Sequence, residues 1–200
     1  MSTGRNAGRR AILHAWLAAG LAGAAGGALA QAGGGRARLA STPSCDAAAE
    51  PTPRQTEGPF YSAGPPERSD FRGDAPGEPM VLVGFVIDTG CRPVAGARVD
   101  LWHTDSEGRY DNDGFRLRGY QLTDEYGRFG FTTIVPGLYP GRTRHFHVKV
   151  ARRGGRVLTT QLYFPDEPGN RRDFIFDERL LMDVREREGG RVGRFDFVVA

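Results

Sequence analysis

The chain lacks an excess of either charge once its first 30 residues are set aside. Residues 1–30 contain three arginines and no acidic side chain, so 27 minus 3 leaves 24 basic groups against 24 acidic ones. A surface without a basic surplus offers no electrostatic attraction to nucleic acid or to an anionic membrane. We therefore expect neither as a partner.

Long hydrophobic runs are also missing. The one apolar stretch near the N-terminus is too short and too rich in glycine for a transmembrane helix. It follows Arg9 and Arg10 and ends in Ala-Leu-Ala at residues 28–30, the pattern of a signal peptide with a small-residue cleavage site. The paired arginines resemble a twin-arginine signal, a route associated with cargo that loads a cofactor before export; an ordinary secretory signal is the alternative. We expect residues 1–30 to direct export to the periplasm or beyond, with no stable membrane insertion afterwards.

Cysteine is scarce, with only Cys45 and Cys91 in the chain. In an exported protein, an even count at such low density favours one disulfide over a metal site or a catalytic thiol. Two unpaired buried thiols are the alternative. Cys91 lies in a segment of turn-forming residues and Cys45 in an irregular leader, so a disulfide would tie the leader to the domain.

Glycine and proline are abundant, with 29 and 13 residues that together make up about a fifth of the chain. Turns must therefore be frequent and long helices few, which favours an all-β fold. The hydrophobic fraction of 39% is enough for the core of one domain. We expect a flexible leader at 31–53 and a single domain at 54–200.

Alternation of apolar and polar residues predicts several short strands in this domain. In the segment 97–103, Val99 and Leu101 fall on one face and charged residues on the other. Only the segment 173–184 is a helix candidate, and its pattern is weak. Strands at short spacing with Gly and Pro turns predict an antiparallel β-sandwich. The other expected strands cover 80–87, 129–134, 144–151, 157–164 and 192–199.

Two histidines, His145 and His147, lie two residues apart in one of these strands. Alternate residues of a strand point to the same side, so both imidazoles face one way while Phe146, Val148 and Val150 face the core. Two histidines on one face form a ready chelate for a metal ion. Two surface histidines without a ligand are the alternative.

Two tyrosines lie in turn-rich segments on either side of a central strand. Tyr139 sits between turn-forming residues a few positions before the histidines, where a tight loop holds its side chain in one place. Tyr110 follows a strand end and precedes a loop rich in Asp and Asn. A tyrosine in such a loop is, by itself, more often a packed phenol than a ligand.

Taken together with the segments Glu57–Tyr61 and Thr160–Phe164, these stretches resemble the intradiol ring-cleavage dioxygenases, the family of catechol 1,2-dioxygenase and protocatechuate 3,4-dioxygenase. The resemblance covers about residues 54–165 in the family's order and spacing. It is greatest to small exported members that lack the helical dimerisation domain of the cytosolic enzymes. It implies a β-sandwich enzyme that opens a catechol-type ring with O2 to give a cis,cis-muconate-type dicarboxylic acid.

The resemblance also implies a mononuclear non-haem Fe(III) centre. The family's motifs match Tyr110, Tyr139, His145 and His147, which would be the four ligands. Tyrosinate is a hard anionic donor that stabilises ferric iron, whereas two histidines and one carboxylate suit Fe(II). The metal must in turn keep both phenols ionised, well below their free pKa of about 10. By analogy, Tyr139 is also the ligand that leaves the metal and accepts a proton from the substrate.

Further residues around the iron are implied in the same way. Arg142 matches the family arginine that stabilises negative charge developing on the substrate, and Gln161 matches a glutamine beside it. A loop salt bridge is the alternative for Arg142. Gly58, Pro59 and Tyr61 match part of the wall of the substrate pocket.

Two other functions account for part of this pattern. A non-catalytic, transthyretin-like envelope β-sandwich that binds a ligand or carbohydrate explains the strands, but not two tyrosines and two histidines in the family's order. A copper or zinc site would use the histidine pair with further ligands such as His103 and Asp105. Colour separates the three, because tyrosinate bound to Fe(III) makes a protein red-brown. Before the histidines the chain has Arg142-Thr-Arg144 where the cytosolic enzymes have Arg-Pro-Ala, so the preferred catechol is not implied.

Overall fold

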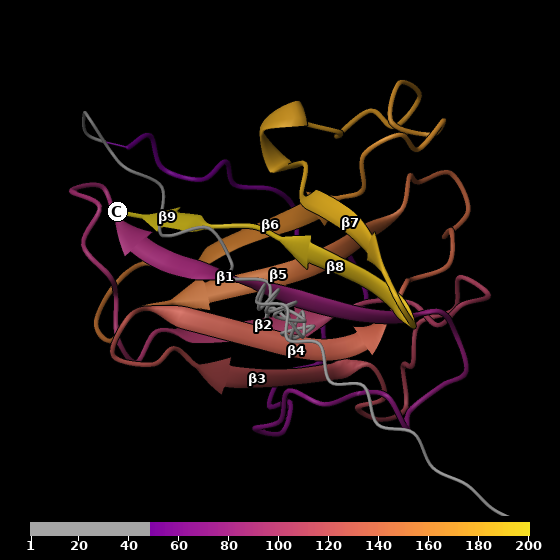
Figure 1. The fold of residues 1–200 in the computed structure, drawn as a ribbon, viewed down its shortest axis with the longest axis horizontal. Helices are drawn as coiled ribbons and strands as arrows, with labels where there is room; N and C mark the ends of the chain where they lie inside the picture. The colour runs from indigo at the N-terminus through magenta and orange to yellow at the C-terminus, as the bar shows by residue number, and fades with distance from the viewer. Residues whose placement is uncertain (1–48) are drawn as a thin grey trace, which may run out of the picture. The chain divides into compact units, whose positions relative to one another are not determined.

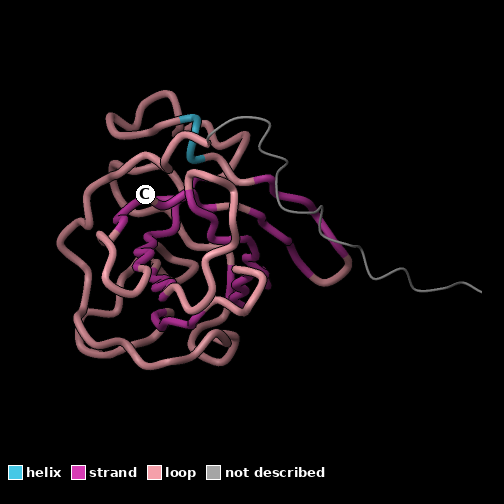
Figure 2. Tube along the Cα trace, turned by 90° about the vertical axis from the view of Figure 1, so that its left-hand side faces the viewer, coloured by secondary structure: helices cyan, strands magenta, loops and turns pink. Residues whose placement is uncertain are grey.

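The computed structural model describes residues 49–200, which form two β-sheets (Figure 1). Helix in this part of the chain is confined to one 3-10 turn, η1 (Glu178–Leu180), and loops surround the strands (Figure 2). The predicted all-β sandwich is confirmed. The strands are β1 (Pro79–Asp88), β2 (Arg98–Trp102), β3 (Arg118–Leu122), β4 (Arg128–Ile134), β5 (His145–Ala151), β6 (Leu158–Tyr163), β7 (Asp183–Arg187), β8 (Gly190–Arg194) and β9 (Phe197–Val199).

The two sheets differ in the direction of their strands. The first has the order β4-β1-β8-β7, with β9 also paired to β1, and the second has the order β3-β2-β5-β6. Every pair in the second sheet is antiparallel, as expected. In the first sheet, however, β1 pairs in parallel with both β8 and β9. One edge of β1 is therefore shared by two short strands that follow one another in the chain.

The strand expected at 192–199 is divided by a break at Phe195 and Asp196 between β8 and β9. The carbonyl oxygen of Phe195 approaches Gly84 of β1 so closely that a Cβ there would lie 1.7 Å from it. The carboxylate of Asp196 accepts the backbone N–H of Phe85 at 3.1 Å, in place of a carbonyl of a continuous strand. The chain can bulge here only because Gly84 has no side chain.

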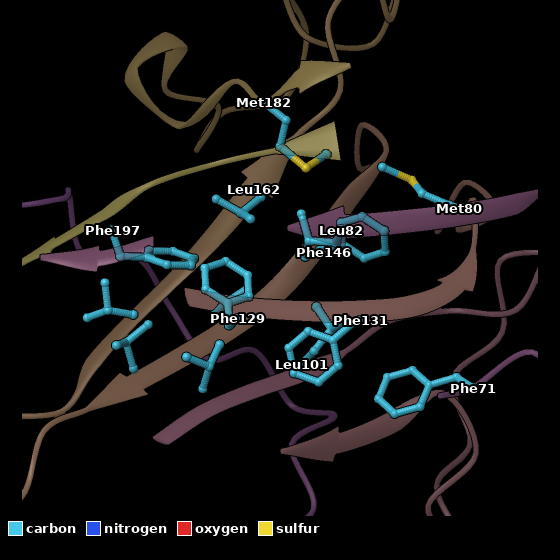
Figure 3. Packing of buried hydrophobic residues seen from close by; sticks show 14 of the residues in the cluster. Phe71, Met80, Leu82, Leu101, Phe129, Phe131, Phe146, Leu162, Met182 and Phe197 are labelled. Carbon is cyan, nitrogen blue, oxygen red and sulfur yellow. The ribbon is translucent and has the colours of Figure 1, made fainter. Parts of the chain in front are cut away.

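Alternate residues of the strands pack between the two sheets (Figure 3). Phe146 of β5 and Leu101 of β2 lie in one buried cluster with Leu82 of β1 and Phe131 of β4. Each side chain of this size that leaves water contributes about 1.5 to 3 kcal/mol to folding. As predicted, β5 buries Phe146 and the two alternate valines in this core. Its other residues, both histidines among them, lie on the outer face of the second sheet.

The helix candidate at 173–184 is wrong, because only η1 forms there and β7 begins within the segment. Side chains of the segment bond to backbone and so compete with helix formation. Asp173 accepts the backbone N–H of Thr143 at 2.9 Å, and Asp177 accepts that of Arg179 at 3.0 Å. Neither β3 nor β7 is predicted by the sequence pattern, since both are rich in charged and polar residues.

The predicted signal peptide at 1–30, most of the leader and Cys45 lie outside the described residues. The last residues of the leader are held against the domain. Thr52 N–H donates to Val198 O at 3.0 Å, and Thr160 Oγ1 donates to Pro53 O at 2.8 Å. Cys91 lies in the turn after β1. Its pairing with Cys45 stays a prediction, because Cys45 is not among the described residues. Within residues 49–200, no helix is long and apolar enough to cross a membrane.

Candidate metal centre

The two histidines of β5 lie side by side on the outer face of the second sheet, as predicted. Both are buried, and their Nε2 atoms are 3.1 Å apart. His145 Nδ1 lies 2.6 Å from the carbonyl oxygen of Thr143, so it carries the proton and donates it. The lone pair of His145 Nε2 is therefore directed at the neighbouring ring. Two close nitrogens on one face make a chelate for a metal ion.

Tyr110 brings a third donor atom to the pair. Its hydroxyl oxygen lies 3.0 Å from His147 Nε2 and 3.3 Å from His145 Nε2. The loop before it is held by Asp105, whose carboxylate accepts the backbone N–H of Arg109 at 3.0 Å. Donor atoms bound to one ion at about 2.0 to 2.2 Å lie about 3 Å from each other. The spacing of the three donors thus fits a shared metal ion.

Burial sets the protonation of these three groups. It lowers the pKa of His145 to about 4 and that of His147 well below its usual value, because the charged imidazolium loses water. It raises the pKa of the Tyr110 phenol, which the nearby Arg142 and Arg118 guanidinium groups oppose. Without a metal, the site holds two neutral imidazoles and a protonated phenol. A bound trivalent cation would supply the positive charge that ionises the phenol.

Tyr139, the fourth predicted ligand, lies beside this group. The centroid of its ring is 5.7 Å from that of Tyr110, and the described contacts of its side chain are ring contacts. Phe60 joins the two tyrosines, since its ring stacks on Tyr110 at 4.4 Å and meets Tyr139 edge-on at 5.3 Å. Tyr139 is half-buried and lies in a tight turn, where its carbonyl accepts Arg142 N–H at 3.0 Å. The donor atoms of Tyr110, His145 and His147 therefore converge, and the Tyr139 ring lies beside the Tyr110 ring.

Arg142 and Gln161 form one network with a residue that the sequence did not reveal. Arg142 Nη2 donates to Gln161 Oε1 at 2.6 Å, and Arg142 Nε donates to Asp173 Oδ2 at 2.8 Å. Asp173 is almost fully buried. Arg142 therefore has a salt bridge, and it also lies beside Gln161 as predicted. The guanidinium lines one wall of a cavity of about 460 Å³, together with Leu138, Gly141, Thr143, Arg172 and Asp173.

The three predicted pocket residues lie at different distances from the histidines. Gly58, with a φ of +70°, lies against His147, since a Cβ at this position would be 3.4 Å from the imidazole Cε1. Pro59 is exposed. Tyr61 packs on Trp102 at 4.9 Å, and Lys149 Nζ lies 3.4 Å above the Tyr61 ring. Gly58 therefore borders the donor group, whereas Tyr61 lies further along the same face.

The structure does not bring His103 and Asp105 to the histidine pair as further ligands. His103 packs edge-on against Phe146 on the core side of the sheet, with ring centroids 4.9 Å apart. Its Nε2 and Nδ1 lie 2.7 Å from Thr133 Oγ1 and Thr104 O, so both nitrogens are engaged. Among residues 49–200, no group of three or more His, Cys, Asp or Glu is placed to hold a metal ion. The donor that the structure places beside the histidine pair is instead the Tyr110 hydroxyl.

His103 makes the stability of the metal-free protein depend on pH. Burial lowers its pKa to about 4 from the usual value near 6.5. Between these values the unfolded chain binds a proton that the folded chain does not, so stability falls as pH falls from 6.5 toward 4. We expect His103→Gln to lessen this fall by up to about 1.4 kcal/mol per pH unit. Urea unfolding of the metal-free protein at several pH values measures it, and equal slopes for the two proteins would contradict it.

Comparison with known proteins agrees with the geometry. The family model described as Dioxygenase matches residues 56–199. Hydroxyquinol 1,2-dioxygenase of Rhizobium sp. (strain MTP-10005) is 34% identical in an alignment of length 160 that covers 66% of this chain and 54% of that protein. Catechol 1,2-dioxygenase of Acinetobacter baylyi is 31% identical in an alignment of length 167 that covers 68% of this chain and 54% of that protein. The chain thus spans about half the length of these relatives.

A solved structure covers the described domain more fully. The dioxygenase domain of a dioxygenase carbohydrate-binding protein fusion from Streptomyces sp. SirexAA-E superimposes with a TM-score of 0.73 and 50% identity. The match covers 75% of this chain and 98% of that one. The match to the family model extends over most of the domain that carries the tyrosines and histidines. The chain belongs to the intradiol ring-cleavage dioxygenase family.

Proposed function

We propose that this chain is an Fe(III)-dependent enzyme that cleaves a catechol-type ring with O2 between the two hydroxylated carbons. The product would be a cis,cis-muconate-type dicarboxylic acid. The observation that carries the proposal is the convergence of Tyr110, His145 and His147, whose donor atoms lie 3.0 to 3.3 Å apart beside Tyr139.

The donor set fits ferric iron better than the ions of other common sites. Two imidazole nitrogens and two phenol oxygens combine neutral donors with hard anionic ones, which suit a trivalent ion. Tyr110, Tyr139, His145 and His147 would hold it. When bound to a catechol, ferric iron would draw electron density from the ring, which makes the ring itself the site of attack by O2.

The two tyrosines have environments that suit different roles. Tyr110 is half-buried, like Tyr139, but its hydroxyl contacts both histidines, so it suits a ligand that stays in place. Tyr139 is half-buried and lies next to the cavity-lining Leu138. It suits a ligand that gives up its position to a catechol oxygen and accepts the proton of that hydroxyl.

Arg142 would act on the substrate. Arg142 lines the cavity of about 460 Å³. Its guanidinium is held by Gln161 and Asp173, so the position of its charge is fixed before the substrate binds. A charge that needs no reorganisation stabilises the negative charge that develops on the ring as O2 attacks. Phe60 packs against Tyr110, and Gly58 lies against His147.

The test is metal analysis and turnover of the purified mature chain. We expect about one iron per chain, a red-brown colour, and O2 uptake with ring opening of catechol, hydroxyquinol, chlorocatechol or protocatechuate. A colourless protein that binds no iron and opens none of these rings would refute the proposal.

We further propose that the chain is exported after removal of residues 1–30 and that Cys45 and Cys91 form a disulfide. The support is the signal-like N-terminal sequence and the even cysteine count. The closed loop spans 91 minus 45, or 46, residues, which would stabilise the fold by roughly 3 to 4 kcal/mol. We expect the exported protein to lack the signal sequence and to react with a thiol reagent only after reduction. Thiol labelling of the unreduced, denatured protein would contradict the disulfide.

A further inference from the structure

Arg118 of β3 is a buried arginine whose bonds go to backbone. Only 2% of it is exposed. Its Nη1 donates to the carbonyl oxygen of Phe60 and its Nη2 to that of Asp111, and Nε has no partner. Within the described part of the chain, no carboxylate forms a salt bridge with it; Asp111 attracts it only at longer range. Burying a guanidinium without an ion pair is costly, so a structural role alone is a poor reason for it.

The two carbonyls that Arg118 holds belong to segments that adjoin Tyr110. Asp111 directly follows Tyr110 in the chain, and the Phe60 ring stacks on Tyr110 with planes only 16° apart. Phe60 also contacts Tyr139 edge-on. One guanidinium therefore holds the backbone next to Tyr110 and the backbone of Phe60, the residue whose ring packs against both tyrosines. Its planar fork can reach two carbonyls at once, which a lysine cannot do.

Arg118 is also joined to the histidines through the sheet. It pairs across the strands with Trp102 of β2, which pairs with His147 of β5, which pairs with Gln161 of β6. The four residues form one row across the outer face of the sheet. Trp102 stacks on His147 with ring centroids 4.9 Å apart and planes 12° apart. The strand pairing therefore keeps Arg118, which holds the Phe60 and Asp111 carbonyls, at a fixed distance from His147.

The backbone just before Arg118 is held in an unfavourable conformation. Leu117 has a φ of 53°, in the left-handed region that branched side chains avoid. Its N–H donates to Asp74 Oδ2 at 2.6 Å, which anchors it. Strain of this kind persists where surrounding structure fixes it, and it is concentrated at functional sites. Here it lies at the entry of the strand that carries Arg118.

We propose that Arg118 is a positioning residue that sets Tyr110 and Tyr139 against the histidine pair by clamping the backbone of Phe60 and Asp111. The inference rests on the proposed iron site, and it assigns Arg118 no contact with iron or substrate.

The experiment compares Arg118→Met with Arg118→Lys and with a control, Arg194→Met, in the iron-loaded protein. Arg194 is a partly buried arginine in the other sheet, where it pairs with Asp196. Visible absorption reports the geometry of tyrosinate bound to iron, and a chelator titration reports iron affinity. We expect Arg118→Met to weaken iron binding about tenfold or more and to shift the visible band. Arg118→Lys should recover the band only in part, and Arg194→Met should lower the melting temperature without moving the band.

The outcomes separate this inference from the proposed function. If the unmodified protein binds no iron, the proposed function fails first. If it is coloured and Arg118→Met keeps its band and iron affinity, only the positioning role is overturned. Should Arg118→Met fail to fold, Arg118→Lys decides: a folded lysine variant with a shifted band supports the role, and one with an unchanged band overturns it.

Discussion

Replacing His147 with alanine should remove iron from the protein almost completely. The imidazole Nε2 of His147 lies within 3.1 Å of the donor atoms of His145 and Tyr110, so its loss removes the donor that makes the two shortest of the three contacts. Changing residues that merely support a metal ligand already costs about 10 to 100-fold in affinity, and losing the ligand itself should cost at least that much. We expect less than about a tenth of the iron content of the unmodified protein, measured by elemental analysis after dialysis.

The loss must be separated from simple unfolding, because His147 also stacks on Trp102. The melting temperature and circular dichroism of the metal-free variant report this directly. His103→Gln is a matched control, since it removes a buried histidine on the core side of the sheet. It should leave iron content unchanged. A folded His147→Ala protein with full iron content would rule out the assigned ligand.

Tyr139→Phe offers a graded comparison with the histidine variant. The phenylalanine keeps the ring contact with Phe60, while the hydroxyl that would bind iron is lost. Because three other donors remain, iron should stay partly bound, with a shifted visible band and reduced turnover. A Tyr139→Phe protein with unchanged colour and rate would show that Tyr139 is not a ligand.

The side-chain directions in this site can be predicted from the sequence where the residues lie in a regular strand. The direction of His145 and His147 follows from the two-residue period of a strand, and the structure confirms it along with the inward packing of Phe146. The positions of Tyr110 and Tyr139 do not follow from any period, since both lie in loops. Only the resemblance to a family connected them with the histidines.

Contacts between distant segments were out of reach of the sequence pattern. Asp173 lies 31 residues from Arg142, and Phe60 lies 58 residues from Arg118. Their roles depend on how loops fold over the outer face of the second sheet, and no local periodicity encodes that. The sequence pattern makes Asp173 part of a weak helix candidate, because its bonds to Thr143 and Arg142 cannot be read from the sequence. Buried polar residues in loops are thus the part of the site that needed the structure.

Arg142→Leu should lower kcat by about a hundredfold or more, the usual effect of losing one fixed electrostatic stabiliser. Arg142 lines a cavity, and its guanidinium is held by Gln161 and Asp173 before any substrate binds. If its charge acts mainly on the transition state, kcat and kcat/KM should fall together, with KM little changed. Oxygen uptake at saturating catechol measures this. Iron content should remain that of the unmodified protein.

The salt bridge with Asp173 adds a stability effect that must be told apart from the catalytic one. Asp173 is almost fully buried, so Arg142→Leu leaves a buried carboxylate without its cation, and breaking such a pair costs about 3 to 5 kcal/mol. The leucine variant should therefore also melt at a lower temperature. Arg142→Lys separates the two effects, because it keeps a cation for Asp173 but loses the planar fork that also reaches Gln161. We expect it to restore most of the melting temperature and only part of kcat. A lysine variant with normal kcat would show that charge alone suffices, and a folded leucine variant with normal kcat would reduce Arg142 to a salt bridge.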